Sequence, residues 1–157
     1  MKTKEQGFAL IELLVVVAII LVIAAISIPN LLRSKMEANE ASAVATMRTL
    51  NTVAIVYSTL YGAYPVALTN LGPATTPSST SADFVDSMLA KDPAIKSGYT
   101  FTWTAVTSSS GPIVGYTLVA TPVTKGSTGQ RGFFTDATGV IRSDPSGTAT
   151  ASSTPLS

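Results

Sequence analysis

The sequence predicts an α+β protein in which one long N-terminal helix packs on an antiparallel sheet of about four strands. Three observations carry this prediction: an unbroken apolar run near the N-terminus, an amphipathic helical pattern directly after it, and alternating strand patterns in the second half. Helical segments followed by strands, without further repeats, favour a helix lying on one face of a sheet. The 157 residues suffice for one domain plus an anchor.

The first expected element is a membrane-spanning helix over residues 8–29, built on the apolar run from Phe8 to Ile28. As a helix, this run would span about 31 Å, which matches the hydrocarbon core of a bilayer. Glu12 is the only charged residue in the run. A charge inside a spanning helix costs roughly 2.5 to 3.5 kcal/mol on insertion scales, so we expect Glu12 to find a partner. The alternative is a carboxylate that snorkels to the membrane surface.

The second expected element continues the helix as an amphipathic segment over residues 30–62. Residues spaced by threes, fours and sevens define one helix face, namely Met36, Ala43, Met47, Leu50, Ala54, Tyr57 and Tyr61. Glu40 and Asn51 fall largely on other faces. We therefore expect one helix from Phe8 to Tyr61, stopped by Gly62, whose second half lies against a sheet.

Pro29 interrupts this long helical pattern. Proline removes one backbone donor, and its ring crowds the carbonyl of Ala25, so the sequence predicts a helix kink at Pro29. Two interpretations stay open: a simple bend where the helix leaves the membrane, and a helix that loosens near Pro29.

Residues 63–98 are expected to form a long connection with a Ser/Thr/Pro-rich loop. Within it, Ser81 would cap a short helix that ends at Ala90. The antiparallel sheet is expected over residues 99–142, where hydrophobic residues alternate with Thr between turn signals. The four expected strands are Tyr99–Val106, Ile113–Ala120, Gly132–Thr135 and Val140–Arg142. Residues 143–157 are rich in Ser, Thr and Pro, and we expect this tail to be frayed.

Composition limits the possible functions. The formal net charge is +1, which gives no support for nucleic-acid binding. The sequence contains no Cys, so no disulfide staples the fold, and no His, the commonest general base and zinc ligand. The acidic residues are scattered over predicted loops and helix faces, and no glycine-rich phosphate loop is present. We therefore predict a protein that is not an enzyme.

Asp136 and Asp144 are the only residues that the sequence suggests for a metal ion. With backbone oxygens near the last turn they could hold Ca²⁺, which prefers oxygen ligands. The alternative is that each aspartate caps a turn. Because the two acids lack a dense D-x-D spacing, we predict no cofactor.

The N-terminal string carries a more specific signal. A short charged leader ends in Gly7, the apolar run starts with Phe8, and Glu12 stands at its fifth place. This arrangement resembles the class III signal peptide of type IV pilins and the related pseudopilins. The resemblance implies that a prepilin peptidase removes residues 1–7 by cutting between Gly7 and Phe8, and methylates the new amino terminus of Phe8. It also implies that Glu12 pairs with the amino group of Phe8 on a neighbouring subunit.

Such a pair makes physical sense, because a buried carboxylate is penalised until an incoming chain brings the compensating charge. The pair would then set the axial register of subunits. Many pilins close a C-terminal loop with a disulfide, and this chain departs from that pattern.

The resemblance implies a structural subunit of a type IV pilus. The prepilin would wait as a single-pass protein in the inner membrane and then polymerise into a helical filament at the cell surface. The implied partners are identical subunits, the prepilin peptidase, an assembly ATPase and an inner-membrane platform. One alternative is a major pseudopilin of a type II secretion system, whose signal peptide would look the same. A different alternative is a membrane-anchored domain that never polymerises.

Overall fold

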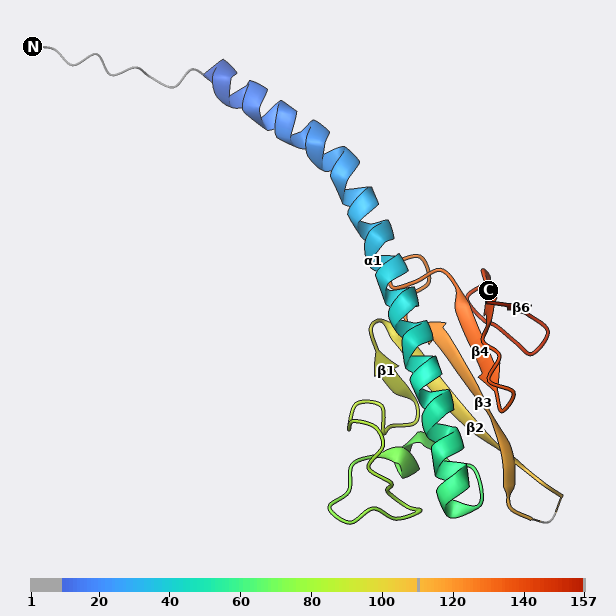
Figure 1. Ribbon diagram of the computed structural model, residues 1–157. Coiled ribbons are helices and arrows are strands. Elements are labelled where there is room, and N and C mark those ends of the chain that lie inside the picture. The colour runs from blue at the N-terminus through green and yellow to red at the C-terminus, as the bar shows by residue number, and fades with distance from the viewer. Residues whose placement is uncertain (1–9, 110, 157) are drawn as a thin grey trace, which may run out of the picture. The chain divides into compact units, whose positions relative to one another are not determined.

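The computed structural model describes residues 10–109 and 111–156. Two compact units divide the chain, one ending at Lys35 and the other beginning at Met36. A single helix, α1 (Leu10–Tyr61), supplies all the described structure of the first unit and the first element of the second. In the second unit α1 packs on an antiparallel sheet (Figure 1), so the predicted α+β class is confirmed.

The C-terminal part of α1 buries one face against the sheet, as the helical periodicity predicts. Ala43, Met47, Leu50 and Ala54 are completely buried, and Tyr57 is nearly so. Burial of such side chains is the main source of stability for an amphipathic helix.

Gly62 stops α1, as predicted. Its φ of +77° lies in the left-handed region that favours glycine, and its N–H donates a hydrogen bond to the Ser58 carbonyl at 2.9 Å.

The sheet has six strands in the order β1-β2-β3-β4-β5-β6, each antiparallel to the next. Their bounds are β1 (Ala94–Lys96), β2 (Tyr99–Thr107), β3 (Ile113–Pro122), β4 (Gly132–Asp136), β5 (Arg142–Asp144) and β6 (Thr154–Pro155). The predicted count of about four strands is therefore wrong, and the strand expected at Val140–Arg142 instead spans Arg142–Asp144. The two additional strands, β1 and β6, have three and two residues, too few to show the alternation that identifies a strand in a sequence.

The C-terminal tail takes part in the sheet, contrary to the expected fraying. Ala149 and Ser153 are buried, and the Leu156 N–H donates to the Ile141 carbonyl at 2.8 Å. The sheet therefore extends from Ala94 to Pro155, beyond the predicted range of 99–142 at both ends.

The short helix predicted over residues 81–90 is absent. The backbone N–H groups of Ala82, Phe84 and Val85 instead donate to carbonyls of Asn70 and Leu71 at 2.9–3.0 Å, which ties this segment to a distant part of the connection. A helix capped at Ser81 would need the Val85 N–H for its own ladder, and the φ of +58° at Asp83 is not helical. The only helix in the connection is a short 3₁₀ turn, η1 (Leu68–Leu71), among the residues described.

Aromatic side chains fill the core between α1 and the sheet. Trp103 and Tyr116 stack with their ring centroids 4.2 Å apart, and Tyr99 and Phe133 lie 5.8 Å apart. The Trp103 indole N–H donates to the Pro65 carbonyl at 3.0 Å, which ties the connection to β2. Buried aromatic rings with satisfied polar atoms hold the second unit together without a disulfide.

Candidate functional site

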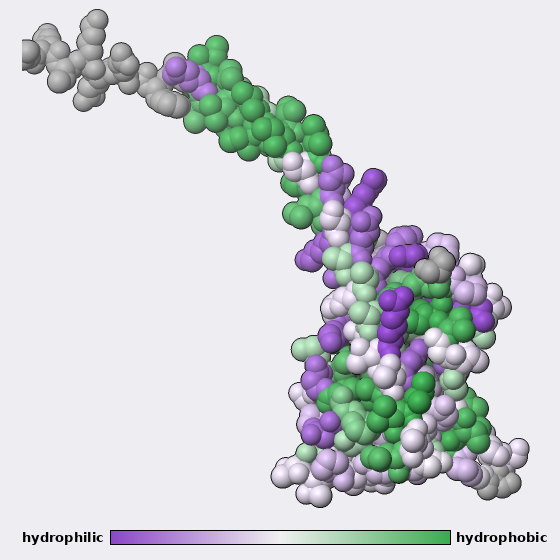
Figure 2. Space-filling model, viewed as in Figure 1, coloured by the Kyte–Doolittle hydropathy of each residue, from purple (hydrophilic) through white to green (hydrophobic). Residues whose placement is uncertain are grey.

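The first candidate site is the apolar part of α1. Every residue from Leu10 to Lys35 is exposed except the half-buried Ala24. Figure 2 shows that the visible surface of this segment is largely hydrophobic. In the described part of the chain, α1 is the one helix long and apolar enough to cross a membrane. So much exposed apolar surface requires either lipid or other helices around it.

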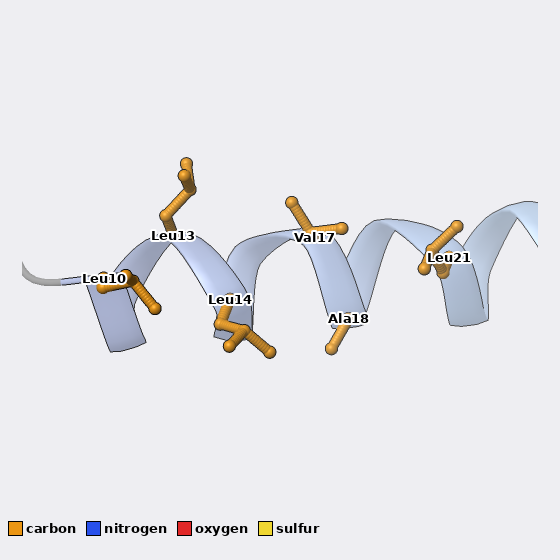
Figure 3. A pocket seen from close by; sticks show the side chains of 6 residues that line it. All are labelled: Leu10, Leu13, Leu14, Val17, Ala18 and Leu21. Carbon is orange, nitrogen blue, oxygen red and sulfur yellow. The ribbon is translucent and has the colours of Figure 1, made fainter.

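Side chains of this segment form shallow grooves between their rows. One groove of about 300 Å³ is lined by Leu10, Leu13, Leu14, Val17, Ala18 and Leu21 (Figure 3). These residues recur at three- and four-residue intervals and therefore share one helix face. The small Ala18 side chain leaves room between its larger neighbours. Rows and grooves of this kind accept the ridges of a second helix.

Glu12 lines a neighbouring groove of about 430 Å³ together with Ile11, Val15 and Val16. The carboxylate therefore stands in an otherwise aliphatic surface, within the first described turn of α1.

Gly7 and Phe8 lie outside the described residues. Cleavage between them, methylation of Phe8 and the pairing of Phe8 with Glu12 therefore stay predictions.

Comparison with known proteins agrees with the motif. A family model described as the prokaryotic N-terminal methylation motif matches residues 2–28, a range that contains Gly7, Phe8 and Glu12. The chain is also 35% identical over 85 residues to the type IV wide pilus major component PilA4 of Thermus thermophilus. The N-terminal region of the chain therefore carries the prokaryotic N-terminal methylation motif.

The match to the Thermus pilin covers 52% of this chain and 65% of that protein, which is less than two thirds of its length. No solved structure matches the chain.

Pro29 stands one residue after the end of the matched motif. The helix does not end there, because α1 continues from Leu10 to Tyr61 with Pro29 inside it. The proline nitrogen has no hydrogen to donate to the Ala25 carbonyl, so one hydrogen bond of the helix is missing. A kink at Pro29 stays a prediction.

Glu40 is a second important residue of α1, and its predicted place away from the buried face is wrong. Only 5% of Glu40 is exposed. Its Oε1 accepts the backbone N–H groups of Gln130 at 2.8 Å and Arg131 at 3.0 Å, and its Oε2 accepts the Arg131 Nε–H at 2.7 Å. Burial raises the pKa of Glu40, but the hydrogen bonds from Arg131 and Gln130 outweigh burial and lower it overall.

Asn51 is also buried rather than solvent-facing, with 7% exposure. Its Nδ2 donates to Thr135 Oγ1 at 3.0 Å, and its Oδ1 accepts the Tyr116 hydroxyl at 3.0 Å. Burial, together with the neighbouring Tyr64 and Asp136, raises the pKa of Tyr116 to about 12. Asn51 therefore ties α1 to both β3 and β4 through satisfied buried polar groups.

A signal for both residues was present in the sequence. Glu40 and Asn51 lie seven and four residues on either side of Met47, which puts all three on one helix face. Polarity alone does not decide exposure, because hydrogen-bond donors from the sheet can satisfy a buried carboxylate or amide.

Asp136 and Asp144 hydrogen-bond within their own turns. Asp136 Oδ1 accepts the Thr138 N–H at 2.9 Å, and Asp144 Oδ1 accepts the Ser146 N–H at 2.8 Å. The Ser146 backbone hydrogen bond is the main reason that the pKa of Asp144 lies below its usual value. Among the residues described, no three His, Cys, Asp or Glu side chains cluster closely enough to hold a metal ion.

Tyr57 and Tyr61, at the end of α1, have ring centroids 4.7 Å apart. Tyr57 is buried and Tyr61 is partly buried against the core, as predicted for a pair that fills the space between helix and sheet.

Proposed function

We propose that this protein is a structural subunit of a type IV pilus. A prepilin peptidase would cut after Gly7 and methylate Phe8, and the mature chain would polymerise through residues 8–29. The observation that carries the proposal is the exposed apolar segment of α1, which bears Glu12 and matches the N-terminal methylation motif. Similarity to a pilus major component of Thermus thermophilus supports it.

In this proposal the apolar segment exchanges one apolar environment for another. Before assembly its side chains are buried in lipid, and after assembly they are buried among neighbouring α1 helices. Removing apolar surface from water is worth roughly 25 cal/mol per Å². Lipid and a helix bundle both keep this surface away from water, so apolar burial alone does not drive the transfer from one to the other.

Two other contributions then decide the direction of assembly. Grooves such as the one lined by Leu13, Val17 and Ala18 provide close helix packing. The Glu12 carboxylate would pair with the amino group of Phe8 on the next subunit and fix the register. An assembly ATPase and an inner-membrane platform would supply the work of extraction.

The same proposal implies where the protein is located and that its role is structural. The prepilin would be a single-pass protein of the inner membrane, and the mature subunit would lie in a filament at the cell surface. The role is structural and requires no catalysis and no cofactor.

The test is N-terminal mass spectrometry on filaments sheared from the cell surface. We expect an abundant chain that begins with N-methylated Phe8. An intact Met1 start in every fraction would contradict processing and leave an anchored domain that does not polymerise.

A major pseudopilin is the second candidate, favoured by the absence of Cys and hence of a C-terminal disulfide. In that case the processed chain would be found only in the cell envelope and not among sheared filaments.

A further inference from the structure

A hollow of about 420 Å³ lies in the second unit, at the end of α1 and the loops next to it. Its lining includes three tyrosines and two hydroxyl residues, namely Tyr57, Tyr61, Tyr64, Ser79 and Thr80. The volume falls within the range of small-molecule sites, which are mostly apolar with a few placed polar groups. Neither the pilin motif nor the packing of the core accounts for this hollow.

The tyrosine rings are held in place by the surrounding structure. The Tyr57 hydroxyl donates to the Ser79 carbonyl at 2.5 Å, and the Tyr57 ring contacts the Tyr61 ring. On the other side the Tyr64 ring packs on Tyr116, with centroids 5.3 Å apart. Because the rings are already ordered, a ligand would not have to order them on binding.

Polar groups are available at the hollow. Within the part of the chain that the structure describes, no hydrogen bond engages the hydroxyl groups of Tyr61 and Tyr64. The Thr80 hydroxyl bonds only to the exposed Ser78 hydroxyl, at 2.9 Å. A phenol or hydroxyl both donates and accepts, so these groups can satisfy the hydroxyls of a ligand.

The uncharged lining of the hollow limits the chemical class of ligand that it can bind. No Asp, Glu, Lys or Arg is among the lining residues in the described part of the chain. An anionic ligand would therefore lose its hydration without a counter-charge. A quaternary ammonium ligand would interact with the aromatic faces alone. It would form no hydrogen bonds with the surrounding hydroxyl groups.

We propose that this tyrosine hollow binds a neutral pyranose ring of a carbohydrate. The apolar C–H face of the sugar would lie on the rings of Tyr61 and Tyr64. The sugar hydroxyls would bond to the two phenol groups and to Ser79 and Thr80. The site lies outside residues 8–29, so this binding does not depend on polymerisation.

The test is saturation-transfer NMR on the full chain in a polyoxyethylene micelle, which contains neither sugar nor ammonium groups. The probes are the methyl glycosides of glucose, galactose, mannose and N-acetylglucosamine, with choline as the cationic comparison. We expect transfer to at least one glycoside and none to choline. Absence of transfer to all four glycosides would overturn the proposal, as would binding of choline alone.

Variants locate the site. The double variant Tyr61→Phe/Tyr64→Phe keeps both rings and removes two hydroxyls, so it should fold and weaken glycoside binding about tenfold or more. The control is Leu60→Ala, which changes an exposed side chain of the same helical turn outside the hollow and should leave the affinity within about twofold. Equal binding by the double variant and the unmodified chain would place the sugar elsewhere and contradict the proposal.

Discussion

The Glu40 carboxylate and the Arg131 guanidinium meet at 2.7 Å, although 91 residues separate them in the chain. The same carboxylate accepts two backbone N–H groups of the segment before β4. Arg131 also places its guanidinium over the Phe133 ring at 5.6 Å. Glu40 therefore fixes α1 to the start of β4 by hydrogen bonds that a shorter or neutral side chain would not reproduce.

Replacing Glu40 by Ala should reduce the free energy of unfolding by about 2 to 4 kcal/mol, because it leaves two backbone donors without their acceptor. The measurement is denaturant unfolding of the full chain in detergent, followed by near-UV circular dichroism. Glu37→Ala is the matched control, since Glu37 is exposed on the preceding turn, and it should change stability by less than about 0.5 kcal/mol. Equal effects of the two substitutions would show that the Glu40 contacts contribute nothing.

The free energy of unfolding should decrease at acidic pH, because Glu40 becomes protonated. The folded state lowers the pKa of Glu40 below its ordinary value of 4.5, so the contribution is present above pH 4.5 and is lost as pH falls through the folded pKa. Unfolding free energies measured from pH 7 to pH 3 should show this loss. Glu40→Gln should be less stable at neutral pH and less sensitive to acid. An identical acid response in the variant would assign the effect to other carboxylates such as Asp144.

The hydrogen bond between Asn51 and Tyr116 should contribute measurably to stability. Tyr116→Phe removes the donor and leaves the buried Asn51 Oδ1 unsatisfied, at a cost of about 1 to 3 kcal/mol. Tyr64→Phe is the control, since its hydroxyl has no partner among the described residues, and it should be nearly neutral. If both variants unfold at the same denaturant concentration, the hydrogen bond between Tyr116 and Asn51 makes no net contribution to stability.

The raised pKa of Tyr116 predicts a second, alkaline loss of stability. The Tyr116 phenol keeps its proton to about pH 12 in the folded state but loses it near pH 10 when unfolded. Its contribution to stability is therefore complete below pH 10 and is lost as the pH rises toward 12. Burial also raises the pKa of Tyr99 and Tyr57, so absorbance titration should show several late phenols. The late amplitude should be smaller by one phenol in Tyr116→Phe. A single titration near pH 10 for all tyrosines would contradict the burial of Tyr116.

Glu12→Ala should sharply reduce the amount of sheared filament while leaving the chain in the membrane. The alanine lacks the charge that would compensate the amino group of Phe8, whereas insertion into lipid becomes easier. Ser27→Ala, which changes another polar residue of the same apolar run, serves as the control and should assemble normally. Normal filament yield from Glu12→Ala would favour an anchored domain in which Glu12 has no assembly role.

Much of the fold could be predicted because α1 repeats one pattern over many turns. The spacing from Ala43 to Tyr57 identified the buried face, and Gly62 identified the helix end. The short strands β1 and β6 could not be predicted, since their pairing depends on neighbours in the folded sheet rather than on their own two or three residues.

The candidate sites differ in the same way. Gly7, Phe8 and Glu12 form a local motif that is visible in the sequence alone. Glu40 and Asn51 could not be paired with partners in advance, because those partners lie more than 60 residues away. The tyrosine hollow requires loops from several parts of the chain, and no local pattern specifies how such loops meet.

The order of the sheet determines which contacts close early when the chain folds. Each strand pairs only with the strand next to it in sequence, so pairing can proceed stepwise through short loops. Contacts of α1 with β4 and with the segment before it close loops of 84 and 91 residues, and they must wait for that distant segment. Because α1 is synthesised first, its buried face has no complete partner surface until the last third of the chain has emerged. Holding the apolar segment in a membrane during that interval would keep the waiting helix apart from other unfinished chains.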